Sequence, residues 1–64
     1  MTRDDIREMS KAKAIKELKA TNRVVNIRMS GRYSIEADVV QDDGSLYRDG
    51  LYDPRDLLAE LLDL

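Results

Sequence analysis

Residues 24–40, VVNIRMSGRYSIEADVV, contain two runs in which apolar and polar side chains alternate. A period of two is typical of half-buried β-strands, and the glycine between the two runs favours a hairpin. A three-residue loop over residues 30–32 would place Met29 opposite Tyr33, and the pairs that follow on this face would also be apolar. In this register Val24 points to the opposite face of the hairpin.

A second turn is indicated by the sequence Asp-Asp-Gly at residues 42–44, because these residue types favour tight turns. The turn would pair Val40 with Leu46 and would begin a short third strand over residues 45–48. Asp49 and Gly50 then indicate a further turn. The middle of the chain is therefore predicted to form an antiparallel meander of two to three strands.

The end of the chain, residues 53–64, has the pattern of an amphipathic helix. Asp53 is a good N-cap residue, and Pro54 suits the first position of a helix. The apolar face is made of leucines at helical spacing, namely Leu57, Leu58, Leu61 and Leu62. We expect this face to pack on the rest of the protein, since an isolated helix of about three turns is marginal in water.

A helix is also predicted over residues 3–20, where Thr2 and Asp5 match a capping box. Its main apolar face consists of three residues, Ala14, Ile15 and Leu18. At about 100° per residue, Ile6 and Met9 fall on nearly the opposite side. Ser10 can cap a second helix, so we expect a bend or break at this position.

These elements predict a small α+β domain over residues 1–64, with the order α-β-β-(β)-α. The chain has no cysteine that could form a stabilising disulfide, and neither cysteine nor histidine to hold a structural zinc ion. A domain of this size buries little of its surface. Its stability therefore depends on good local sequence or on burial against another chain.

Charge is divided unequally along the chain. Residues 1–34 have a formal charge of +5 and residues 35–64 a formal charge of −7, which together give the net charge of −2. Such a division is more informative than the net charge, because a small domain acts on its partners mainly through its surface.

Catalysis is not expected, because the chain has no histidine and no cysteine. Its acidic residues near glycines do not have the spacing of an EF-hand, and no glycine-rich phosphate loop is present. We therefore expect no catalytic residue, no metal site and no cofactor.

A protein partner is the preferred functional hypothesis. Several apolar residues fall outside the main apolar faces, namely Ile6, Met9, Val24, Val40 and Leu46. Either the helices cover both faces of the sheet, or these residues contact another chain. The acidic residues of the second half, among them Asp42, Asp43 and Asp49, would suit a partner that is itself basic, such as a nucleic-acid-binding protein. An uncovered edge strand could also pair with a second copy of the chain.

The alternative hypothesis is a nucleic-acid-binding module. Its candidate residues form a basic stripe across the first helix and the hairpin, namely Lys13, Lys16, Lys19, Arg23 and Arg28. The acidic net charge and the low aromatic content make this the second choice.

The order of helix, hairpin and helix in a chain of this length resembles the small head–tail joining proteins of phages, although residues 41–52 add a turn and a strand. The resemblance implies a phage-type accessory protein. The chain contains no apolar run of membrane-spanning length, and we expect a cytoplasmic protein. The sequence thus predicts a non-enzymatic binding module that acts as an inhibitor, an adaptor or an assembly factor.

Overall fold

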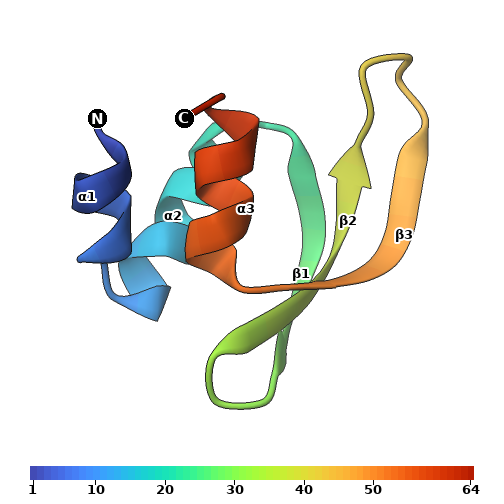
Figure 1. The fold of residues 1–64 in the computed structure, drawn as a ribbon. Helices are drawn as coiled ribbons and strands as arrows, with labels where there is room; N and C mark the ends of the chain where they lie inside the picture. Colours follow the sequence, from blue (N-terminus) through green and yellow to red (C-terminus); the bar gives the residue numbers. More distant parts are fainter.

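The computed structural model describes all 64 residues. Its elements, in chain order, are α1 (Arg3–Arg7), α2 (Lys11–Ala20), β1 (Val24–Ser30), β2 (Ser34–Val40), β3 (Leu46–Tyr52) and α3 (Pro54–Leu61). The strands form one antiparallel sheet with β2 between β1 and β3. Figure 1 shows the three helices gathered on one side of the molecule, with β3 farthest from them. The predicted α+β layout is confirmed, including the third strand.

The N-terminal region forms two helices because Ser10 caps the second one. The Ser10 hydroxyl accepts a hydrogen bond from the Lys13 N–H at 3.1 Å, and Thr2 with Asp5 forms the predicted capping box at the start of α1. This break changes the direction of the chain between α1 and α2. Ile6 and Met9 consequently reach the same core as the apolar face of α2.

The core lies between the helices and one face of the sheet. Its central members come from α2, β2 and α3, and they include Leu18, Ile35, Ala37, Leu57 and Leu58. Full burial of an aliphatic side chain of this size stabilises the folded state by about 1.5–3 kcal/mol. In a domain this small, a few such residues therefore supply most of the driving force for folding.

The hairpin register differs from the predicted one. Ser30 lies opposite Ser34 and Met29 opposite Ile35, so the loop consists of residues 31–33 and the predicted pairing of Met29 with Tyr33 is wrong. Gly31 has φ = 67°, a left-handed conformation that glycine adopts without steric cost. The loop is thus built around this glycine, and Tyr33 belongs to the loop.

A β-bulge at Asn26 reverses the faces of the first part of β1. Asn26 has φ = 55°, and beyond it Val25 lies opposite Asp38 and Val24 opposite Val39. The bulge adds one residue to β1 relative to β2, so side chains before it turn to the other side. Val24 is therefore buried in the core, which corrects the prediction that it points away from it.

A second bulge lies in β3. Asp49 has φ = 57°, and the strand continues through it to Tyr52, so the predicted turn at Asp49 and Gly50 is wrong. Beyond the bulge, Gly50 lies opposite Ala37 and Tyr52 opposite Ile35. The predicted pairing of Val40 with Leu46 at the other end of β3 is confirmed.

Candidate functional site

The sheet has one face against the helices and one face that no helix covers, which we call the open sheet face. Side chains alternate along a strand, and Ile35, Ala37 and Val39 point into the core. The intervening residues of β2 and their neighbours therefore lie on the open sheet face. Its members are Val25, Arg28, Glu36, Asp38, Val40, Leu46 and Leu51.

Asp38 is the centre of the open sheet face and is only 3% exposed. Its Oδ2 accepts a hydrogen bond from the Asn26 side-chain amide at 2.8 Å, and its Oδ1 accepts one from the Asp49 backbone N–H at 2.8 Å. Asn26 and Asp49 are the two bulge residues on either side of β2. One carboxylate in the central strand thus holds both bulges.

Arg28 covers Asp38 and joins the three strands through charge. Its guanidinium lies 2.9 Å from Glu36 Oε1, 2.9 Å from Asp49 Oδ1 and 3.8 Å from Asp38 Oδ1. The hydrogen bonds from Asn26 and Asp49, together with this positive charge, hold the pKa of Asp38 below its usual value despite its burial. A carboxylate that is ionised and supplied with donors in this way is a poor proton acceptor at neutral pH. Its two hydrogen bonds hold the bulges of β1 and β3 in place.

Apolar side chains surround this charged centre. Leu51 is 64% exposed, Leu46 is 39% exposed and Val25 is 38% exposed, and Val40 is half-buried beside Leu46. Sequence reasoning found Val40 and Leu46 but missed Val25 and Leu51. Both were missed because their faces are set by the bulges, which the alternating pattern does not reveal.

The β2–β3 turn places two acidic residues next to Val40 and Leu46. Asp43 Oδ1 accepts hydrogen bonds from the backbone N–H and the hydroxyl of Ser45, and these bonds lower the pKa of Asp43. Asp42 is fully exposed and forms an ion pair with Arg23 at 3.2 Å. The turn therefore brings Asp42 and Asp43 to the end of the sheet where Val40 pairs with Leu46, but Asp42 lies on the helix side, where it lines a hollow with Val39 and Leu57.

Three of the predicted partner-binding residues are not on the surface. Ile6 is 2% exposed, Met9 is 9% exposed and Val24 is 4% exposed, and all three belong to the core. The break at Ser10 turns Ile6 and Met9 inward, and the bulge at Asn26 turns Val24 inward. Some of the apolar residues that lay outside the predicted apolar faces are thus buried in the protein's own core.

The predicted basic stripe is divided between two parts of the molecule. Lys13, Lys16 and Lys19 are exposed on α2 and take part in no ion pair. Arg23 and Arg28 lie on the sheet side, where each is paired with carboxylates. The five residues therefore do not form one continuous cationic surface.

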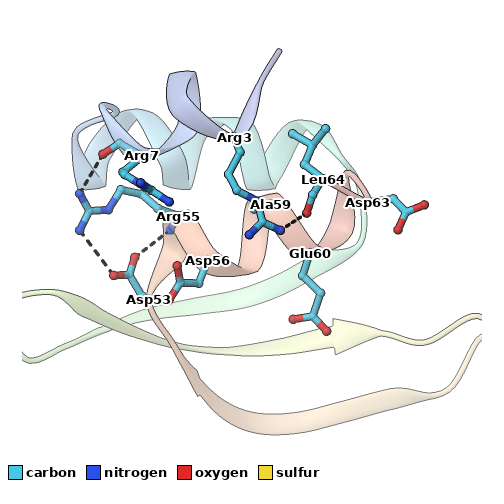
Figure 2. A pocket seen from close by; sticks show the side chains of 9 residues that line it. All are labelled: Arg3, Arg7, Asp53, Arg55, Asp56, Ala59, Glu60, Asp63 and Leu64. Carbon is cyan, nitrogen blue, oxygen red and sulfur yellow. Dashed lines mark hydrogen bonds and ion pairs between the residues drawn. The ribbon is translucent and has the colours of Figure 1, made fainter.

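A depression of about 500 Å³ lies between α1 and α3, and Figure 2 shows the side chains that line it. Its charged lining residues are of both signs, namely Arg3, Arg7, Arg55, Asp53, Asp56, Glu60 and Asp63. The Arg3 guanidinium donates to the Leu64 carbonyl oxygen, and that of Arg55 contacts the Arg7 carbonyl oxygen and the Asp53 carboxylate. These contacts tie α1 to both ends of α3 and explain the depression as a helix–helix junction.

No helix of the structure combines the length and the apolar character needed to cross a membrane. The chain matches no protein-family model, no curated protein and no solved structure.

Proposed function

We propose that this protein is a binding module that recognises another protein through its open sheet face. The observation that supports the proposal is the exposure of Leu46 and Leu51 on the open sheet face, with Leu46 next to the turn that contains Asp42 and Asp43. Protein interfaces commonly combine an apolar centre with a polar rim. The partner that fits is a protein with an apolar patch next to basic residues.

The residues around Asp38 favour recognition by a preformed surface. Arg28 and the two bulge residues are held in place by several charge-assisted hydrogen bonds. A surface fixed in this way loses little conformational entropy when a partner binds. The acidic turn would add steering of a basic partner, and this contribution weakens as salt is added.

A pair of variants on one strand tests the proposal. Leu51 is 64% exposed on the open sheet face, whereas Tyr47 is 60% exposed and lies opposite Val39, so it points to the other face. We expect Leu51→Gln to abolish capture of the partner from a nuclease-treated cell extract, and Tyr47→Gln to leave capture intact. Quantitative mass spectrometry of the captured proteins measures both effects.

The acidic turn is tested with a double variant that keeps the hydrogen bonds of Ser45 and removes the charge that Asp42 presents to Arg23. In the double variant Asp42→Asn/Asp43→Asn, the amide oxygen at residue 43 can still accept the hydrogen bonds from Ser45. We expect capture to fall and to lose its dependence on salt. The proposal is wrong if Leu51→Gln and Tyr47→Gln capture the same proteins in equal amounts.

A further inference from the structure

A second concave surface lies where the β1–β2 loop meets the first residues of α2 and α3. This hollow has a volume of about 270 Å³, and its charged and aromatic lining residues are Lys11, Arg32, Tyr33, Asp53 and Arg55. The Lys11 ammonium group lies 3.3 Å from the carbonyl oxygen of Gly31 and 3.4 Å from that of Arg32. The loop is therefore fixed beside the start of α2.

Positive charge is in excess in this hollow. It contains three cations and one carboxylate, and Asp53 is already engaged by the Arg55 backbone N–H at 2.9 Å and by the Arg55 guanidinium at 3.5 Å. Lys11 and Arg32 take part in no ion pair. The uncompensated charge is suited to a phosphate group.

Tyr33 adds a stacking surface to these cations. It is 64% exposed, and the Arg32 guanidinium carbon lies 5.6 Å from the centre of its ring. An exposed aromatic ring next to arginine is a common platform for an unpaired nucleobase. The hollow therefore offers partners for both the base and the phosphate of one nucleotide.

Two further cations lie on α2 outside the hollow, with Lys19 about 80° and Lys16 about 140° around the helix axis from Lys11. Lys16 and Lys19 are exposed, and the helix from Lys11 to Lys19 is about 12 Å long. Lys13 differs from them because it lines another depression together with three acidic residues, Asp5, Glu8 and Glu17. The side of α2 that carries Lys16 and Lys19 is thus the part that can follow a phosphate backbone.

We propose that the hollow and this side of α2 bind single-stranded nucleic acid, with a base stacked on Tyr33 and phosphates beside Lys11, Arg32, Lys16 and Lys19. A single strand is favoured over a duplex because a base must be free of its own stack to lie on the ring.

The site is separate from the proposed protein-binding surface. It lies where the β1–β2 loop meets α2 and α3 on the helix side of the sheet, whereas Leu46 and Leu51 lie on the open sheet face. Asp42 and Asp43 lie at the opposite end of β2, a strand of seven residues that is about 23 Å long. Figure 1 shows the two loops at opposite ends of the sheet. The two proposals can therefore be tested independently, and the failure of one does not contradict the other.

Fluorescence anisotropy with labelled 15-nucleotide single strands, RNA and DNA of the same mixed sequence, tests the proposal. We expect Tyr33→Leu and Arg32→Gln each to weaken binding by about fivefold or more. The matched controls Tyr47→Leu and Arg48→Gln change the same residue types on β3, and we expect them to stay within about twofold of the original protein. Binding of either strand type supports the proposal. A preference for RNA or for DNA shows which of the two sugars the site accepts.

The salt dependence of binding reports the phosphate contacts on α2. For single strands the slope of log affinity against log salt is about −0.7 per neutralised phosphate, so Lys16→Gln/Lys19→Gln should reduce its magnitude by about 1.4. Circular dichroism of each variant verifies that the fold is retained. Four outcomes overturn the proposal: no binding at 50 mM salt, equal or tighter binding of a duplex, equal affinity for a 5′-mononucleotide, or equal losses in the loop variants and the β3 controls.

Discussion

Gly50→Ala is expected to destabilise the protein because the ring of Tyr52 occupies the space that a side chain at residue 50 would need. Gly50 is buried on β3 opposite Ala37. A Cβ atom added there would lie 2.5 Å from Cζ and 2.6 Å from Cε2 of the Tyr52 ring. Gly50 has an ordinary negative φ, so alanine would otherwise be favourable at this position in a strand.

The cost follows from this geometry. Carbon atoms in contact are normally 3.5–4.0 Å apart, so the ring has to retreat by about 1 Å. Tyr52 packs against the core, and its partial burial raises the pKa of its hydroxyl. Overpacking of this kind costs about 1–3 kcal/mol. A domain of this length has a total free energy of unfolding of roughly 3–10 kcal/mol, so the loss is large.

Urea unfolding followed by circular dichroism at 222 nm measures the effect, and a double-mutant cycle identifies its cause. With the ring removed in Tyr52→Ala, the further change Gly50→Ala should cost less than about 0.5 kcal/mol. In the control background Tyr47→Ala, the full cost should remain. If Gly50→Ala costs the same with and without the Tyr52 ring, a clash with that ring is not the reason for the loss.

Three further predictions concern the core, the helix break and pH. Leu58→Ala should cost about 2–5 kcal/mol in urea unfolding, because Leu58 is 1% exposed, whereas Leu62→Ala at a 40% exposed position should cost less than about 1 kcal/mol; similar costs would mean that the core is misplaced. Ser10→Ala should lose about 1 kcal/mol of stability and Ser10→Asp should retain most of it, since only the latter can cap α2; equal melting temperatures would argue against this cap. The folded-state pKa of Asp38 is lowered, so its contribution to stability is present above its unfolded pKa of about 3.9 and is lost as the pH falls through the folded value. Urea midpoints between pH 2 and pH 7 should therefore fall less steeply on acidification in Asp38→Asn, and parallel curves would contradict this reasoning.

Local signals in the sequence were sufficient to predict the helical segments and the residues at which they begin. A cap such as Ser10 or Asp53 acts on N–H groups two or three residues away, so the sequence contains the whole interaction. The same holds for the turn at residues 42–44, which brings Val40 and Leu46 together as expected. These features could be predicted because the partners are close in the chain.

The two bulges could not be predicted because their cause is distant in the chain. Asn26 is held by Asp38, twelve residues later, and Asp49 by the same carboxylate from the other side. A single inserted residue leaves a nearly regular alternation on both sides, so the pattern cannot reveal it. The errors at Val24, Val25 and Leu51 all follow from these bulges. They changed which residues were assigned to the candidate site more than they changed the predicted fold.

The two hydrogen bonds of Asp38 also bear on the edges of the sheet. β1 and β3 are both edge strands, and each has its left-handed residue held to the centre of the sheet. A kinked edge does not present a straight row of free amides on which fibrils could grow. One buried carboxylate therefore holds both of the bulges that interrupt the two edges of the sheet.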